Sequence, residues 1–468
     1  MSGDSSDDLS SMTACELARQ VARRAVSPVE ATRRALDRAG AAQGSLNAFT
    51  VLFADQALAA AREAEAAVMR GDPLGPLHGV PISVKDLIAV AGAPLTFGSR
   101  TMAHNIATDD APAVTRARAA GAIVIGKTTT SEFGCKAVGD SPLNGITRNP
   151  WDRGKTPGGS SAGAAASVAA GITPLALGTD GGGSIRIPCC LTGLAGIKAQ
   201  FGRVPVWPCS AAPTLSHVGP MARTMADAAL LLMAIAGYDA RDPFAVASPL
   251  PDLMAACEAG AAGLRIAYSR TLGYARPDPA VVGVLDTAAK RFEALGCAVE
   301  TVETVFATDP VEIWGPEFYA AIGTRLAPIL AGQRDQLDPA VADLLEAALR
   351  QDLRAYYTTV FERYALRERM RIFLERYDLL LSPVLPVAAL DVGKNLPDHH
   401  ADRNLVSWVY YTYPFNLTGQ PAATVCAGFA DGMPVGLQLV GRALGEYDVV
   451  RAAAAFEATQ PMRWPSAF

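Results

Sequence analysis

The sequence contains little that would hold a metal ion or build a disulfide framework. Its 468 residues include only 5 histidines, and none of them forms an H-E-x-x-H motif or another pair with ligand spacing. The 8 cysteines are scattered along the chain without a Cys-x-x-Cys pair, which favours reduced thiols over structural disulfides. We therefore expect no metal, no cofactor and a cytoplasmic location.

Long apolar runs and an excess of positive charge are also missing. No stretch approaches the roughly 18 to 20 apolar residues that cross a bilayer, and the polar, acidic start of the chain does not resemble a signal peptide. The formal net charge is -5, with 41 Lys and Arg against 46 Asp and Glu. Such a chain has no general positive field to hold a nucleic-acid backbone. The sequence thus predicts a soluble protein whose partner is neither a membrane nor a nucleic acid.

What is present is enough apolar material for a large core. Hydrophobic residues make up 50% of the chain and charged residues 19%, which excludes a disordered or fibrous protein. This length is compatible with one large domain or with a few smaller ones. Because no internal repeat and no linker divide the sequence, we expect a single α/β domain.

The first 70 residues carry the apolar spacing of helices. Two helices are expected between residues 15 and 41, and Ser27 and Pro28 serve as the N-cap and first residue of the second. A third helix is expected over 54–70, where Gly71 ends it. Residues 1–70 should therefore form a helical segment that packs on the core of the main domain, residues 71–468.

Strands and helices alternate after this segment. Residues 80–90 and 122–126 are apolar and β-branched, which predicts buried strands, and a helix is expected between them over 110–120. A further helix opens at Ser161, and a strand over 172–177 follows it. This rhythm is typical of α/β proteins.

The second half of the chain differs in the pattern of its apolar residues. Residues 225–385 are dominated by helical patterns and predict a mainly helical cap or insertion. Strand patterns then return, and residues 423–429 and 435–440 predict an antiparallel hairpin. We therefore expect a single large domain with a twisted mixed β-sheet flanked by helices.

Lys85 is one of only 7 lysines, against 34 arginines, and it lies in an apolar strand. Burial disfavours the ammonium form and lowers the pKa of a lysine, which makes it a possible base. The alternative is a lysine at a strand end that reaches solvent or pairs with Asp86. Because side chains alternate between the faces of a strand, Asp86 should point away from the groups that Lys85 faces.

The first of two glycine-rich loops, Thr156–Gly163, leads into a helix of small residues. Its pattern fits a capped helix N-terminus, and it also fits an anion cradle. It lacks the Gly-Lys-Ser/Thr ending of a P-loop and the G-x-G-x-x-G fingerprint. A nucleotide site is therefore the weaker of the two interpretations.

The second glycine-rich loop, Gly178–Pro188, follows an apolar strand. Its run of glycines before Ser184 lets backbone N–H groups converge beside a hydroxyl, which suits the stabilisation of an oxyanion. Asp180 and Arg186 flank the glycines, and we expect them to pair across the loop and fix its shape. A flexible turn is the alternative interpretation.

These features together resemble the amidase signature family of serine hydrolases. The resemblance is carried by Lys85 in Val-Lys-Asp, by Gly-Gly-Ser-Ser at 158–161 and by Gly-Thr-Asp-Gly-Gly-Gly-Ser-Ile-Arg at 178–186. It covers residues 65–225 and 375–460, and the region between them is not diagnostic. It implies the amidase signature fold and hydrolysis of amide carbon–nitrogen bonds without a cofactor. The implied partners are a small-molecule amide and water, for a monomer or homodimer.

The resemblance also implies a role for individual residues. Ser184 is the implied nucleophile, Ser160 a relay preceded by a cis peptide bond, and Lys85 the base, a Ser-cisSer-Lys triad. The implied oxyanion hole consists of the backbone N–H groups of Gly181, Gly182, Gly183 and Ser184. The residues implied to support this triad are Ser161, Asp180 and Arg186.

The substrate pocket is predicted from aromatic and small side chains. The candidates are Phe133, Cys135, Trp207, Trp314 and Phe318. Ordinary core packing is the alternative for each aromatic residue. An apolar pocket with aromatic walls favours aryl or alkyl amides and anilides over highly charged substrates, and the same acyl-enzyme chemistry extends to carbamates and esters.

Two other functions share parts of this pattern. The A subunit of a glutamine-dependent tRNA amidotransferase has the same triad, but its loop usually continues Ser-Ile-Arg-Gln-Pro, and Ile187 stands here in place of the glutamine. A nucleotide-binding or structural module would use the glycine loops alone. We expect an independent amidohydrolase.

Overall fold

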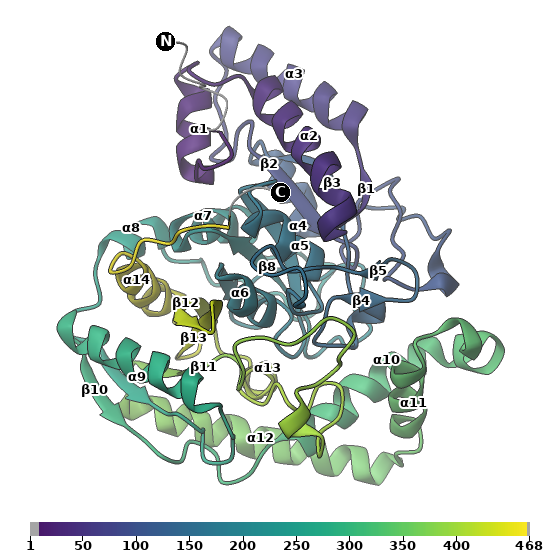
Figure 1. Ribbon diagram of the computed structural model, residues 1–468, viewed down its shortest axis with the longest axis vertical. Helices are drawn as coiled ribbons and strands as arrows, with labels where there is room; N and C mark the ends of the chain where they lie inside the picture. Colours follow the sequence, from purple (N-terminus) through teal and green to yellow (C-terminus); the bar gives the residue numbers. More distant parts are fainter. Residues whose placement is uncertain (1–8, 466–468) are drawn as a thin grey trace.

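The computed structural model describes residues 9–465 and shows one mixed β-sheet with helices on its faces (Figure 1). The main sheet has 11 strands in the order β1-β3-β2-β6-β8-β7-β12-β13-β11-β9-β10, and β4 and β5 form a separate pair. The strands are β1 (Phe49–Leu52), β2 (Pro81–Lys85), β3 (Ile123–Thr128), β4 (Asp140–Ser141), β5 (Gly145–Ile146), β6 (Leu175–Asp180), β7 (Ala195–Lys198), β8 (His217–Ala222), β9 (Arg265–Tyr268), β10 (Ala298–Thr301), β11 (Leu379–Pro383), β12 (Ala422–Ala430) and β13 (Met433–Gly441).

Helices cover the sheet and extend beyond it, with α10 and α11 at the lower right and α12 along the bottom of the view in Figure 1. The α-helices are α1 (Ala14–Ala22), α2 (Pro28–Leu46), α3 (Ala54–Arg70), α4 (Pro112–Ala119), α5 (Ala162–Ala169), α6 (Arg186–Thr192), α7 (Met225–Ile235), α8 (Leu253–Glu258), α9 (Pro279–Ala294), α10 (Val311–Gln333), α11 (Pro339–Ala348), α12 (Leu353–Arg376), α13 (Pro414–Thr418) and α14 (Glu446–Glu457). Short 3-10 helices are η1 (Arg100–Met102), η2 (Glu132–Gly134), η3 (Arg334–Gln336) and η4 (Asp398–His400).

The expected α/β class with a mixed sheet is confirmed. β2 pairs in parallel with β3 and with β6, whereas β6 pairs antiparallel with β8. The predicted C-terminal hairpin is formed by β12 and β13, and Asp431 and Gly432 take positive φ in its turn. Aliphatic side chains on both faces of the sheet form the core, as continuous apolar strands require.

Residues 1–8 of the predicted helical segment 1–70 lie outside the described residues, and within the rest the prediction is wrong at one place. α2 ends at Leu46, its C-cap Asn47 takes a left-handed conformation with φ of 50°, and the chain then forms β1. β1 pairs antiparallel with β3, so that Phe49 lies opposite Thr128. The strand is only 4 residues long, which is too short for its alternation to stand out between two helical patterns. The N-terminal segment thus contributes an edge strand to the sheet as well as helices.

The segment 225–385 is mainly helical but contains strands of the main sheet. β9 pairs in parallel with β11 and with β10, which places β10 at the far edge of the sheet. The region is therefore more than a helical cap, because it completes the sheet beyond β11. The predicted strand over 80–90 is also shorter than expected. β2 ends at Lys85, where the Ile88 N–H donates to the Lys85 carbonyl at 2.9 Å and turns the chain.

No helix within residues 9–465 combines the length and the apolar content that a membrane crossing requires.

Candidate active site

Lys85 lies at the end of β2 with its side chain fully buried. Its Nζ is 2.6 Å from Ser160 Oγ and 2.8 Å from Thr179 Oγ1. Burial lowers the pKa of Lys85 well below its usual value, and the Asp180 carboxylate opposes this shift only in part. Burial therefore disfavours the ammonium form of this amine, which lies between two hydroxyl groups.

Asp86 points to the opposite face of the sheet, as alternation predicts. Its carboxylate forms an ion pair with Lys127 Nζ at 2.9 Å, and both side chains are fully buried. It also accepts a hydrogen bond from the Thr96 N–H at 3.2 Å. Lys85 thus neither reaches solvent nor pairs with Asp86. The alternative interpretation, a lysine at a strand end that does one or the other, is wrong.

Ser160 stands in the loop before α5, and the peptide bond between Gly159 and Ser160 is cis. The backbone of Gly159 lies against Val138, whose carbonyl oxygen would be 2.3 Å from a Cβ at that position. Only glycine fits this approach. The next residue, Ser161, bridges to β6: its hydroxyl donates to the Thr179 carbonyl at 3.2 Å and accepts from the Thr179 N–H at 3.3 Å.

Ser184 follows β6 in the loop that leads into α6. Its side chain is partly exposed, and among residues 9–465 its hydroxyl shares no hydrogen bond with another protein atom, Ser160 included. The structure thus joins Lys85, Ser160 and Thr179 directly. Ser184 is brought to the same end of the sheet on the loop that begins directly after β6.

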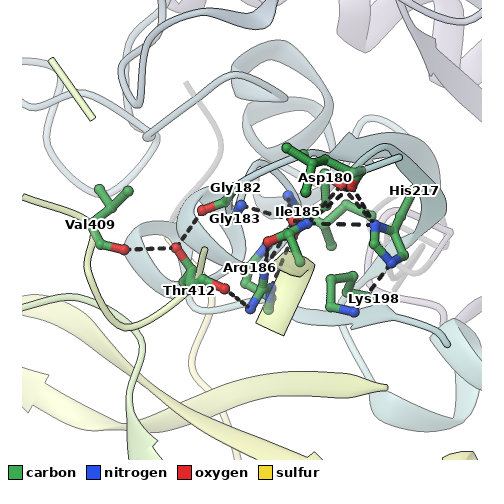
Figure 2. Close-up of polar contacts among 12 residues, drawn as sticks. Asp180, Gly182, Gly183, Ile185, Arg186, Lys198, His217, Val409 and Thr412 are labelled. Carbon is green, nitrogen blue, oxygen red and sulfur yellow. Dashed lines mark hydrogen bonds and ion pairs between the residues drawn. The ribbon is translucent and has the colours of Figure 1, made fainter. Parts of the chain in front are cut away.

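Asp180 and Arg186 pair across the second glycine-rich loop, Gly178–Pro188, as expected (Figure 2). Arg186 Nη2 lies 2.9 Å from Asp180 Oδ1 and Arg186 Nε lies 3.0 Å from Oδ2, with both side chains fully buried. Burial alone raises the pKa of Asp180, but the guanidinium outweighs it and holds the pKa well below the usual value. The pair is completed by Asn416 and Gln438, which bind Arg186 at 2.7 Å each.

The backbone N–H groups of the loop are not all available to an oxyanion. The Gly183 N–H donates to Asp180 Oδ1 at 2.8 Å, which corrects the expectation that it lines the oxyanion hole. The physical reason is the ion pair, because the same Asp180 carboxylate that binds Arg186 also accepts the hydrogen bond from the Gly183 N–H. The N–H groups that donate to no protein acceptor among the described residues are those of Gly181, Gly182 and Ser184.

Two of the predicted pocket residues lie directly on the loop. The Trp314 indole donates from Nε1 to the Gly181 carbonyl at 2.9 Å. The Phe318 ring lies so close to Gly181 that a Cβ there would be 2.9 Å from its Cε2 atom. Trp314 stacks on Phe318 and on Tyr413, with ring centroids 4.7 and 5.3 Å apart. An aromatic wall from α10 therefore covers the glycines.

Of the other three predicted pocket residues, Phe133 and Cys135 have contacts near the site with residues that the structure describes, and Trp207 does not. Phe133 precedes Gly134, where a Cβ would be 3.3 Å from Ser160 Oγ, so its loop lies beside Ser160. Cys135 is buried and its carbonyl accepts a hydrogen bond from Tyr319 at 3.1 Å. Trp207, by contrast, is 36% exposed and has no ring contact within residues 9–465. Among the described residues, no hydrogen bond or ring contact joins Trp207 to Lys85, Ser160 or Ser184.

Sequence reasoning missed several residues that build this site. Thr179 contacts Lys85, and its position next to Asp180 in the second glycine-rich loop was the available signal. Asn416 and Gln438 lie within C-terminal segments that match the family, but their contact with Arg186 depends on tertiary structure. Within the described part of the chain, no group of 3 or more His, Cys, Asp and Glu side chains is placed to hold a metal.

Comparison with known proteins gives consistent matches along the chain. The Amidase family model matches residues 30–450. An acylamidase of Rhodococcus erythropolis is 37% identical over 465 residues, which is 96% of each chain. The A subunit of the Glutamyl-tRNA(Gln) amidotransferase of Moorella thermoacetica is 35% identical over 477 residues, covering 95% of this chain and 96% of the relative.

Solved structures show the same similarity. A bacterial aryl acylamidase of the amidase signature enzymes superimposes with a TM-score of 0.91 at 29% identity, covering 96% of both chains. The 6-aminohexanoate cyclic dimer hydrolase, solved with its substrate, superimposes with a TM-score of 0.88 at 27% identity, covering 98% of this chain and 99% of that one.

Proposed function

The chain belongs to the amidase family and is an amide-hydrolysing enzyme, and on that premise we propose that it works through an acyl-enzyme on Ser184 with Ser160 and Lys85 as the proton relay. The observation that carries this proposal is the fully buried Lys85 amine, whose pKa burial lowers, at 2.6 Å from the Ser160 hydroxyl. A neutral amine has a free lone pair, so it can take a proton that an ammonium group cannot.

The proposed acylation follows from these positions. Lys85 takes the Ser160 proton while Ser160 takes the proton of Ser184, and Ser184 Oγ forms a bond to the carbonyl carbon of the amide. The negative charge that develops on the carbonyl oxygen is met by free N–H groups of the loop. The carbon–nitrogen bond then breaks, and the leaving nitrogen takes a proton back through Ser160.

Deacylation uses the same groups with water in place of the amine. Water gives its proton to the relay, attacks the acyl carbon and forms a second tetrahedral intermediate. Its collapse breaks the bond to Ser184 Oγ and returns a proton to that oxygen. Each step uses only side chains, backbone N–H groups and water.

We further propose aryl and alkyl amides or anilides as the substrates, with carbamates and esters as additional ones. Trp314, Phe318 and Tyr413 form an apolar aromatic wall over the glycines, which favours uncharged and aromatic acyl or amine groups. The acylamidase of Rhodococcus erythropolis and the aryl acylamidase structure are similar over 96% of this chain, which supports this substrate class.

The A subunit of a tRNA amidotransferase is the second candidate function, because one such protein is 35% identical to this chain. Against it stands Ile187, which replaces the glutamine expected after Ser-Ile-Arg in these proteins. Its side chain is 2% exposed and packs against Gly183. We therefore propose a protein that acts alone, as a monomer or homodimer in the cytoplasm.

A hydrolysis screen tests this function. Purified enzyme is incubated with an anilide, a primary amide, an ester and a carbamate, and the release of amine or alcohol is followed. We expect turnover of the anilide without any partner protein. Turnover of glutamine alone, stimulated by added partner proteins, would instead identify a component of an amidotransferase.

A further inference from the structure

The carbonyl oxygens of the nucleophile loop, Gly178–Pro188, are held by donors from distant parts of the chain (Figure 2). The Asp180 carbonyl accepts from His217 Nδ1 at 3.1 Å and from Asn416 Nδ2 at 3.1 Å. The Gly182 carbonyl accepts from Thr412 Oγ1 at 2.5 Å. With the Trp314 contact to Gly181, three successive carbonyls of the loop are thus fixed.

These contacts also set the direction of the N–H groups. A peptide unit is planar and trans, so its N–H points opposite to its carbonyl. Fixing the Asp180 carbonyl therefore fixes the N–H of Gly181, and fixing the Gly181 carbonyl fixes the N–H of Gly182. Both N–H groups are free of protein acceptors among the described residues, and both belong to the expected oxyanion hole.

The ring of His217 has a defined tautomer. Nδ1 faces two carbonyl oxygens, of Asp180 at 3.1 Å and of Leu215 at 2.8 Å, so Nδ1 carries the hydrogen. Nε2 lies 3.3 Å from Lys198 Nζ, a hydrogen-bond donor, and therefore accepts. Burial, followed by the adjacent Lys198, lowers the pKa of His217 well below its usual value, which keeps the ring neutral.

Lys198 is itself buried and fixed. It ends β7, and its Nζ donates to the Gln420 carbonyl at 2.6 Å and to the Ala199 carbonyl at 3.3 Å. Its third contact is His217 Nε2. Neither Lys198 nor His217 contacts Lys85, Ser160 or Ser184 among the described hydrogen bonds. The proposed proton relay therefore uses neither Lys198 nor His217 in a proton transfer.

We propose that His217 is a positioning residue for the reaction. Its Nδ1–H holds the Asp180 carbonyl, so that the N–H of Gly181 in the same peptide stays directed at the developing oxyanion. Lys198 fixes the His217 tautomer that carries the hydrogen on Nδ1. The inference rests on the proposed acyl-enzyme at Ser184. It assigns a function to a buried histidine and lysine that lie outside the triad.

Three variants of His217 separate positioning from packing. The side-chain amide of His217→Asn places an N–H where Nδ1 stands, whereas that of His217→Gln places it where Nε2 stands. His217→Leu keeps the volume and removes both nitrogens. We expect His217→Gln and His217→Leu to lower kcat roughly 10- to 100-fold, since misdirecting one oxyanion donor costs less than removing it. His217→Asn should recover most of the lost activity.

The decisive readout is the affinity for an aryl boronic acid, which forms a tetrahedral adduct on the nucleophile and places an oxygen in the oxyanion hole. We expect its Kd to rise in His217→Gln by the same factor as kcat falls, with KM unchanged. Unchanged boronate affinity, equal losses in the Asn and Gln variants, or wild-type kcat in His217→Gln would each overturn the proposal. If His217→Leu does not fold, the Asn and Gln pair decides.

A control and a labelling assay complete the design. His400→Leu removes another buried histidine, which binds the Tyr410 hydroxyl at 2.6 Å. It should lower thermal stability and leave the boronate affinity unchanged. A fluorophosphonate probe that labels wild-type enzyme but not Ser184→Ala confirms the nucleophile. If the probe does so while His217 variants behave as wild type, only the positioning inference fails.

Discussion

The carboxylate of Asp180 accepts a hydrogen bond from the Gly183 N–H at 2.8 Å and closes the nucleophile loop on itself. The same carboxylate forms two contacts with the Arg186 guanidinium, at 2.9 and 3.0 Å. A buried charge pair therefore sets the conformation of the glycines before Ser184. We therefore expect the shape of the loop to depend on both charges.

Asp180→Asn tests this dependence. The amide removes the negative charge and leaves a buried guanidinium without its partner, which costs about 3 to 5 kcal/mol of unfolding free energy. Urea denaturation followed by circular dichroism measures the change. Glu368→Gln, which breaks a surface pair with Arg371, should leave the midpoint unchanged. An equal midpoint in the two variants would contradict the role given to Asp180.

Ser184→Ala should abolish acylation. The alanine has no oxygen to form the ester, and removing a nucleophile of this type lowers kcat by about 10⁶-fold in comparable enzymes. Mass spectrometry after fluorophosphonate treatment should show the added mass on wild type and on Ser45→Ala, a change on α2 away from the site. Burst kinetics that persist in Ser184→Ala would remove Ser184 from the mechanism.

The pH dependence of kcat/KM reports the protonation of Lys85. Its pKa is lowered by burial, so the neutral amine extends to lower pH than in a free lysine and takes up a proton as the pH falls. Only the neutral form accepts a proton, and kcat/KM should therefore decrease towards acid pH. A profile measured between about pH 6 and 9 that stays flat would contradict a lysine base. Lys85→Ala should remove most activity while the fold is retained.

Thr179→Val tests the second hydroxyl on Lys85. Valine keeps the shape of threonine but removes the oxygen that lies 2.8 Å from Nζ. Loss of one such contact lowers kcat about tenfold, and the acidic limb of the pH profile should move to lower pH because the ammonium form loses a hydrogen-bond acceptor. Thr179→Ser keeps the oxygen and should behave as wild type. A variant Thr179→Val with an unshifted limb would limit Thr179 to packing.

Phe318→Ala tests the aromatic wall. Removing the ring that stacks on Trp314 at 4.7 Å opens space over Gly181 and takes away apolar contact area for an aromatic group. We expect kcat/KM for an anilide to fall roughly 10-fold or more relative to a short aliphatic amide. Comparing the two substrates in one preparation cancels errors in enzyme concentration. An unchanged ratio would place the pocket elsewhere, and Trp207→Ala serves as the control from the exposed loop.

Some features of this protein follow from local sequence. Alternation along β2 separates Lys85 from Asp86, and the structure shows the two on opposite faces with different partners. The flanking charges of the glycine run predict the Asp180–Arg186 pair. These relations span few residues, so backbone geometry and charge alone determine them.

Other features depended on the tertiary structure. Thr179 meets Lys85 because β6 pairs with β2, and His217 meets the Asp180 carbonyl because β8 pairs with β6 on its other side. β1, β9 and β10 are 4-residue strands whose place in the sheet is set by their neighbours. Spacing along a chain determines which face a side chain takes, but strand order is decided by contacts between segments far apart in sequence, and those contacts alone bring His217 and Trp314 to the nucleophile loop.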